Sequence, residues 1–201
     1  IFNLFKLKCS KSCTIIQKKS VPMKEKISFL KNKIDLVSPN KNIVPVTTTI
    51  DNSENLNIGG CSIEDLVRKY DSPLYILDEI TLRNSCRAYK KALKKYYPGV
   101  SLPIYASKAN SSIFMSNLVA SEGFGLDAVS EGELLTALKG RVPNEKIVFH
   151  GNNKSDKEIA FAIKNKIKVI VDNDHDLRRL EEISNSLNYD LEIMIRFTPG
   201  I

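Results

Sequence analysis

The pattern of hydrophobic positions changes near residue 100. After Gly99, short apolar runs alternate with longer stretches in which apolar residues recur every three or four positions. Short apolar runs between turn residues predict buried strands, and the three-to-four spacing predicts helices that pack on them. The predicted strands are 102–107, 125–129, 146–150, 168–172 and 191–197, and the predicted helices lie near 112–122, 131–140, 155–165 and 174–187.

Two of these predicted helices begin with the pattern of a capping box. The pairs are Ser130 with Glu133 and Ser155 with Glu158, each spaced so that serine and glutamate can bond to each other's backbone N–H groups. Buried strands that alternate with helices require parallel pairing and right-handed crossovers. The second half of the chain is therefore predicted to be an α/β fold with a parallel sheet.

The pattern before residue 100 is less regular. A helix is predicted to begin after Ser62, with Asp65 three residues on, and to stop at Asp71-Ser72-Pro73. A short apolar strand is predicted at 74–77. A helix is predicted from Glu79, because Leu82, Cys86, Tyr89, Leu93 and Tyr96 recur at intervals of 4, 3, 4 and 3 before Pro98-Gly99. The segment up to Asn57 has weak periodicity and is expected to hold little regular structure.

A polar residue lies at or near the end of every strand in the alternating region. These residues are Lys108, Asp127, His150, Asp172 and Arg196, separated by 19, 23, 22 and 24 positions. So regular a repeat predicts that all five lie at one edge of a parallel sheet, which is the mouth of a (β/α) barrel or the crevice of a doubly wound sheet. Uniform units without a G-x-G-x-x-G sequence favour the barrel. A full barrel needs about 250 residues, so residues 101–201 are predicted to form the amino-terminal half of one.

Charge and composition exclude several classes of function. The net charge of +7 is concentrated in residues 1–50, which hold ten lysines and two acids, so the remainder is nearly neutral. A near-neutral body argues against a nucleic-acid partner, and no apolar run approaches the 18 residues of a membrane span. The cysteines at 9, 13, 61 and 86 form no C-x-x-C pair and are remote from both histidines, so no metal site is predicted. Without a dense disulfide framework, a reducing compartment is the simpler interpretation.

The first 22 residues have a composition unlike the rest. They contain five lysines and no acid, which fits either a targeting leader or a non-native upstream segment, with Met23 preferred as the start. Cytoplasmic localisation follows from a start at Met23, and a plastid-like organelle follows from a genuine leader. The remaining divisions are a weakly structured lead-in at 23–61, a helix, strand and helix at 62–100, and the half barrel from 101.

A lysine that faces an aspartate, a histidine and an arginine suggests carbonyl chemistry. At neutral pH well under ~1% of an ordinary lysine is the neutral amine that attacks a carbonyl, and burial or a nearby cation increases that fraction. Simpler interpretations remain open. Asp127 and Arg196 can satisfy each other at the sheet edge, and His150 can be a hydrogen-bonded structural histidine. His175, at a charged helix start, is expected to be solvated.

Four ordered blocks of the sequence resemble a known family. They are Tyr105-Ala106-Ser107-Lys108-Ala109-Asn110, residues 125–134 (GLDAVSEGEL), residues 149–155 (FHGNNKS) and residues 195–200 (IRFTPG). Together they resemble the diaminopimelate decarboxylase family, whose members are pyridoxal-phosphate (PLP)-dependent enzymes with an alanine-racemase-type barrel. The resemblance runs from about Gly59 to Ile201. Ser111-Ser112-Ile113-Phe114 after the lysine block differs from racemases, and residues 150–154 (HGNNK) differ from the Asn-Pro-type block of ornithine and arginine decarboxylases.

The resemblance implies a fold, a reaction and a set of site residues. The fold is a partial (β/α)8 TIM-type barrel of PLP fold type III, without the carboxyl-terminal β domain that family members carry, so an amino-terminal fragment inactive by itself is expected. The implied reaction is the conversion of meso-2,6-diaminopimelate to L-lysine and CO2 by a homodimer. Lys108 is implied as the catalytic Schiff-base lysine, and Asp127, His150 and Arg196 as cofactor neighbours, with Glu133 close by. A decarboxylase of another basic amino acid and a non-enzymatic PLP-binding barrel are the alternatives.

Overall fold

A computed structural model describes residues 43–197 of the chain. The chain divides into two compact units, Ile1–Ser85 and Cys86–Ile201, and each is described by itself. The predicted leader, Met23 and the final residues of the last sequence block lie outside the described residues. No helix within residues 43–197 is both long and apolar enough to cross a membrane.

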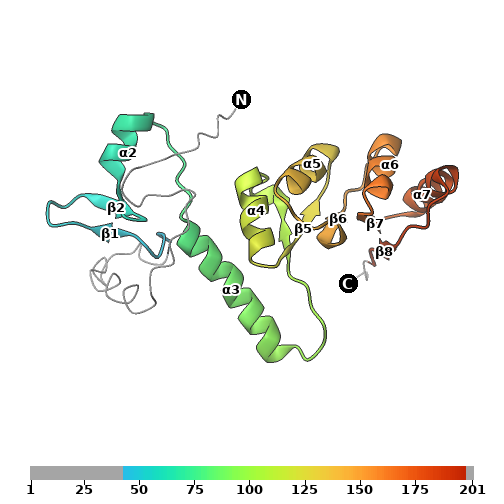
Figure 1. The fold of residues 1–201 in the computed structure, drawn as a ribbon, viewed down its shortest axis with the longest axis horizontal. Helices are drawn as coiled ribbons and strands as arrows, with labels where there is room; N and C mark the ends of the chain where they lie inside the picture. Colours follow the sequence, from blue (N-terminus) through green and yellow to red (C-terminus); the bar gives the residue numbers. More distant parts are fainter. Residues whose placement is uncertain (1–42, 198–201) are drawn as a thin grey trace. The chain divides into compact units, whose positions relative to one another are not determined.

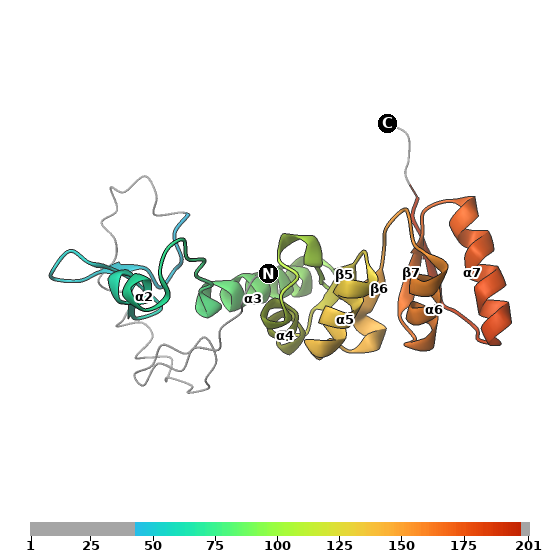
Figure 2. The same cartoon turned by 90° about the horizontal axis from the view of Figure 1, so that it is seen from above.

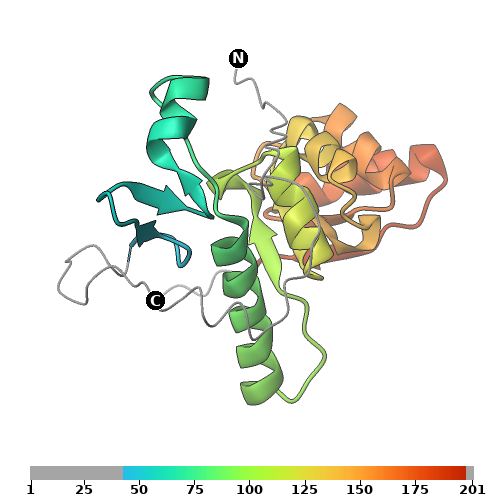
Figure 3. The same ribbon diagram turned by 60° about the vertical axis from the view of Figure 1, so that its left-hand side comes forward.

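The first unit contains a small antiparallel sheet that the sequence pattern did not predict. Its strands are β1 (Thr49–Ile50), β2 (Leu56–Ile58) and β3 (Cys61–Ser62), in that order. Figure 3 shows this sheet beside α2 (Ile63–Tyr70). The Ser62 hydroxyl accepts a hydrogen bond from the Asp65 N–H, so the predicted cap of α2 is confirmed. Cys61 is disulfide-bonded, which the cysteine spacing did not predict.

The segment after α2 differs from its prediction. Residues 74–77 form no strand, and Tyr75 is 90% exposed. An apolar run becomes a strand only where a neighbouring strand takes up its backbone hydrogen bonds, and this run has no such neighbour among the described residues. The next element, α3, spans Glu79–Tyr96 as predicted.

The second unit is built on the predicted parallel sheet. Its five strands are β4 (Ile104–Ala106), β5 (Gly125–Ala128), β6 (Ile147–Phe149), β7 (Lys168–Val171) and β8 (Ile193–Ile195), and they lie side by side in chain order (Figure 1). Every neighbouring pair is parallel. All carboxyl ends therefore lie at one edge, which is what the spacing of the polar residues predicted.

The helices between the strands also have the predicted positions. They are α4 (Ile113–Ser121), α5 (Glu131–Lys139), α6 (Asp156–Lys164) and α7 (Asp174–Leu187), and Figure 2 shows them along one face of the sheet. The hydrophobic core lies between this face and the helices. Its fully buried members include Leu126, Leu134, Ile147, Phe149, Ile159, Ile163, Ile167 and Val169.

The two predicted capping boxes differ in detail. At α6 the box is complete, because Ser155 and Glu158 each bond to the other's backbone N–H. At α5 the Ser130 hydroxyl accepts from the Glu133 N–H, but the Glu133 carboxylate accepts from the Val129 N–H, at 2.8 Å, rather than from Ser130. Both arrangements fix the point at which a strand gives way to a helix, and so they fix the sheet edge.

Candidate active site

The five polar residues of the predicted repeat lie at the carboxyl edge of the parallel sheet. Lys108 lies in a short 3-10 helix, η1 (Ser107–Ala109), directly after β4. Asp127 is the third residue of β5. His150, Asp172 and Arg196 each follow the last residue of β6, β7 and β8. The fold therefore brings together residues that are far apart in the sequence.

Four of these residues form a connected network. The Asp127 Oδ1 atom lies 3.9 Å from His150 Nδ1, and His150 Nε2 lies 3.5 Å from Asp172 Oδ1. Arg196 Nη1 is 3.3 Å from both His150 Nε2 and Asp172 Oδ1. The predicted alternative in which Asp127 and Arg196 pair with each other is wrong, because His150 and Asp172, on the two intervening strands, separate them.

The network selects the tautomer of a neutral His150 ring. An arginine side chain only donates hydrogen bonds, so the contact with Arg196 Nη1 makes His150 Nε2 the acceptor. The ring proton then lies on Nδ1, which faces Asp127. Contacts at both ring nitrogens hold His150 between two carboxylates and a guanidinium.

Asp127 is the residue whose ionisation the site changes. Burial raises the pKa of the Asp127 carboxyl above its ordinary value of 3.8, and the charge of Glu133 adds to this effect. His150 and Lys108 act in the opposite direction and lower the pKa, but less than the two raise it. The exposed Lys108 is therefore close enough to Asp127 for their charges to interact.

The face of the sheet away from the helices carries a hollow next to Asp127. Its lining consists of Ile104, Ala106, Asp127, Val148, Ile170 and Met194, one or two from each strand. These residues alternate along the strands with the core residues of the helix-covered face. An apolar surface with one carboxylate at its edge suits the binding of a ring that carries polar substituents.

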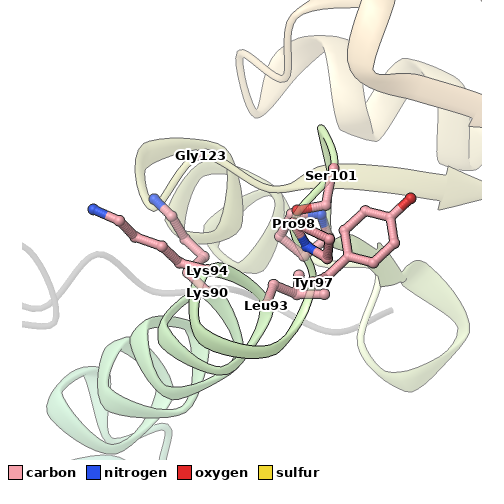
Figure 4. A pocket seen from close by; sticks show the side chains of 9 residues that line it. Lys90, Leu93, Lys94, Tyr97, Pro98, Ser101 and Gly123 are labelled. Carbon is pink, nitrogen blue, oxygen red and sulfur yellow. The ribbon is translucent and has the colours of Figure 1, made fainter.

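A second hollow in this unit lies at the opposite edge of the sheet. Figure 4 shows Lys90 of α3, Tyr97 just after that helix and Gly123, which precedes β5, around it. Pro103, which precedes β4, also lines it. Its position at the amino ends of the strands separates it from the network. Barrel enzymes build their active sites at the carboxyl ends.

The sequence interpretation missed two residues behind the network. The side chains of Lys154 and Asp176 are 0% and 3% exposed, and Lys154 Nζ lies 2.7 Å from Asp176 Oδ2. Both stand in strongly polar stretches of the sequence, where a fully buried charged side chain is uncommon. His175, next to Asp176, is exposed as predicted. The available signal was that Lys154 belongs to the sequence block at 149–155.

Comparison with known proteins identifies the family. The family described as "Pyridoxal-dependent decarboxylase, pyridoxal binding domain" matches residues 80–201. The chain belongs to this family. Its parallel sheet is part of the PLP-binding barrel of fold type III decarboxylases, and the predicted cofactor class is confirmed.

Family members named diaminopimelate decarboxylase are similar to the chain. That of Synechocystis sp. is 44% identical over 172 residues, covering 82% of this chain and 37% of the relative. That of Bacillus subtilis is 38% identical, covering 73% of this chain and 34% of the relative. The chain thus spans about a third of the length of these relatives.

Solved structures of family members agree with the fold. The diaminopimelate decarboxylase of M. jannaschii has a TM-score of 0.73 at 31% identity, covering 77% of this chain and 36% of that one. The enzyme of Helicobacter pylori complexed with L-lysine has a TM-score of 0.65 at 35% identity, covering 69% of this chain and 34% of that one.

The residues of the network fit the cofactor of this family. Among the described residues, Asp127 Oδ1 and Asp172 Oδ2 are buried oxygens without a hydrogen-bond partner. Buried acceptors of this kind are costly unless a ligand or water satisfies them. Asp172 Oδ2 faces Lys154, whereas Asp127 Oδ1, with Lys108, Arg196 and the adjoining apolar hollow, offers an acceptor, an amine and a cation to a polar aromatic ring such as that of PLP.

Proposed function

We propose that this chain supplies the lysine-bearing half of the active site of a PLP-dependent decarboxylase that converts meso-2,6-diaminopimelate to L-lysine and CO2. One observation carries the proposal. A chain that is 44% identical to a diaminopimelate decarboxylase over 172 residues carries Lys108 directly after β4 and Asp127 on the neighbouring β5, both at the carboxyl edge of a barrel sheet.

The proposed roles follow from the contacts at this edge. Lys108 would hold the cofactor, because its amine follows β4 at the mouth of the barrel. The positive charge of Lys108 lowers the pKa of the Asp127 carboxyl, although burial raises that pKa more. When bound, PLP supplies an electron sink for the electron pair left as CO2 departs.

His150 and Arg196 line the same site. In the neutral ring, acceptance of a hydrogen bond from Arg196 leaves the proton on Nδ1, which lies 3.9 Å from Asp127 Oδ1. Arg196 is more than half exposed even though one of its nitrogens binds Asp172, so its guanidinium can also attract an anionic group. Glu133 contributes negative charge near Asp127 while it stabilises the start of α5.

A sibling decarboxylase is the second candidate. The lysine/ornithine decarboxylase of Vibrio vulnificus has a TM-score of 0.58 at 27% identity to this chain. The fold thus accommodates other basic amino acids. The higher identity to diaminopimelate decarboxylases favours the first candidate. We further propose the domain boundary at 101, a homodimer and a cytoplasmic location for the full-length protein.

Side-by-side measurement of CO2 release tests the proposed substrate. Full-length protein loaded with PLP is given diaminopimelate, ornithine or arginine. We expect release from diaminopimelate with a kcat/KM at least about a hundred-fold higher than from the others, since a site built to bond a substrate's polar groups rejects analogues that lack them. Equal or faster release from ornithine or arginine would establish the sibling function.

The same assay tests the role of Lys108. Lys108→Ala should lose at least about 1000-fold in kcat, because it removes the amine that holds the cofactor. The matched control is Lys139→Ala, which removes an exposed lysine at the end of α5, away from the carboxyl edge. The control should retain wild-type release. A Lys108→Ala protein with wild-type release would contradict the proposal.

A further inference from the structure

Lys154 is buried to a degree that is unusual for lysine. It lies between β6 and α6, and its side chain is 0% exposed. Its amine donates to the Gly151 carbonyl and to Asp176 Oδ2. The turn that allows this return contact includes Gly151, whose φ of +112° is in the region that favours glycine. A lysine is almost never fully buried unless its charge is compensated.

The amine of Lys154 also faces Asp172. Its Nζ lies 3.7 Å from Asp172 Oδ2, and the Asp172 side chain is 8% exposed. At this distance the two groups form an ion pair but no hydrogen bond. Asp172 Oδ2 therefore has no hydrogen-bond partner among the described residues. The positive charge of Lys154 therefore compensates the negative charge of this oxygen on its buried side.

Asp172 joins this buried pair to the mouth of the barrel. Its other oxygen, Oδ1, lies 3.3 Å from Arg196 Nη1 and 3.5 Å from His150 Nε2. One carboxylate thus contacts a buried cation on one side and two proposed cofactor neighbours on the other. Any change in its charge or position would act directly on both of them.

We propose that Lys154 is a positioning residue for the cofactor site. It holds the Asp172 carboxylate in place through the ion pair at 3.7 Å, and Asp172 in turn holds His150 and Arg196 at the carboxyl edge, while Asp176 holds Lys154. This inference rests on the proposed function, because His150 and Arg196 matter only if that edge binds PLP.

Holding α6 and α7 together does not require a buried ion pair. Arg179 of α7 already bonds to Asp156, the first residue of α6, with its Nε atom 2.8 Å from Asp156 Oδ1. This cross-link is largely solvent-accessible at the aspartate, and Arg179 Nη1 also donates to the Lys154 carbonyl oxygen, 2.7 Å away. A buried ion pair adds little stability over a well-packed apolar pair, so it needs another explanation.

The test compares PLP affinity across a set of variants of the full-length protein. Lys154→Met with Asp176→Leu removes the buried pair as a neutral unit. Asp172→Asn removes the charge through which Lys154 is proposed to act, and leaves the pair of Lys154 and Asp176. The dissociation constant is measured by titrating PLP into the cofactor-free protein and following its absorbance.

We expect the dissociation constant for PLP to rise about ten-fold or more in each of the two variants. This is the factor that corresponds to the free energy of one charge-assisted hydrogen bond at the cofactor site. Combining all three substitutions should be no worse than Asp172→Asn alone, because the two changes act through one carboxylate. The control, Arg178→Met, should stay within about two-fold of the wild type, because it removes an exposed arginine of α7 and leaves the contacts of Lys154 with Asp176 and Asp172 in place.

Three results would overturn the proposal. One is wild-type affinity for PLP in Lys154→Met with Asp176→Leu. Another is a dissociation constant in the combined variant that rises by the product of the two separate factors. The third is failure of the Lys154→Met, Asp176→Leu protein to show a cooperative thermal transition, which would make the pair structural. Wild-type protein that binds PLP but releases no CO2 from diaminopimelate would contradict the proposed substrate, while the affinity comparison would still decide the role of Lys154.

Discussion

At the scale of single residues, Asp127 combines a functional position with a cost to stability. Its carboxylate loses water on folding, and one of its oxygens is buried without a hydrogen-bond partner among the described residues. Burial raises its pKa above 3.8, so ionisation is less favourable in the folded protein than in the unfolded chain. Groups whose ionisation destabilises the fold in this way are typical of ligand-binding sites.

Asp127→Asn should therefore stabilise the fold and weaken PLP binding. The folded-state pKa is raised, so ionisation of Asp127 destabilises the protein above that pKa, and the cost disappears as the pH falls below 3.8. We expect a higher melting temperature than wild type at pH 7 and no difference near pH 3. A lower melting temperature at pH 7 would contradict this account, and Lys139→Ala serves as a neutral control.

At the scale of the elements, the junctions between strands and helices carry specific side-chain bonds. Burial opposes ionisation of Glu158, yet bonds from the Ser155 N–H and hydroxyl and from the Glu131 N–H lower its pKa below 4.5. The lowered pKa means that Glu158 adds stability at pH values above 4.5. That stability is lost as the pH falls through the folded-state value.

Glu158→Ala should cost about 1–2 kcal/mol of unfolding free energy at pH 7, because it leaves the first turns of two helices without an acceptor. Urea unfolding at pH 7 and at low pH measures this, and the difference from wild type should shrink in acid. Glu181→Ala, an exposed glutamate on α7, is the matched control and should stay within about 0.5 kcal/mol. An unchanged difference in acid would show that the charge of Glu158 is not the cause.

Close contact between β5 and β6 depends on Gly125. A Cβ atom there would lie 2.4 Å from the Lys146 carbonyl oxygen, which is backbone and cannot move aside cheaply. Gly125→Ala should destabilise by about 1–3 kcal/mol in urea unfolding. Gly132→Ala is the control, since the nearest atom to its Cβ would be 3.9 Å away and alanine favours the helix. Equal stability of both variants would contradict the steric explanation.

Local signals explain what the sequence could predict at this scale. The strands and helices after Gly99 follow from hydrophobic spacing and from caps such as Ser155 with Glu158, which act within a few residues. The gathering of Lys108, Asp127 and Arg196 at one edge follows from parallel pairing. The burial of Lys154 and Asp176 depends on contacts between α6, α7 and β7, so the polarity of the sequence around them does not distinguish them from solvated residues. Membership of the block at 149–155 is the one signal that marks Lys154.

At the scale of the whole molecule, the barrel unit has strongly exposed apolar residues at its last described strand. Ile195 and Phe197 are 73% and 83% exposed, at and just beyond the end of β8. The 201-residue chain by itself should therefore associate through this edge. Light scattering should report species larger than a monomer, and Ile195→Lys with Phe197→Lys should reduce them. A monodisperse monomer of the unaltered chain would contradict this expectation.

The central claim is that Lys108 is the residue that holds PLP. Borohydride reduction of the PLP-loaded full-length protein, followed by proteolysis and mass spectrometry of the peptides, tests it directly. We predict a single reduced pyridoxyl label on the peptide that contains Tyr105-Ala106-Ser107-Lys108. Labelling of another lysine, or full labelling of the Lys108→Ala protein, would contradict the account.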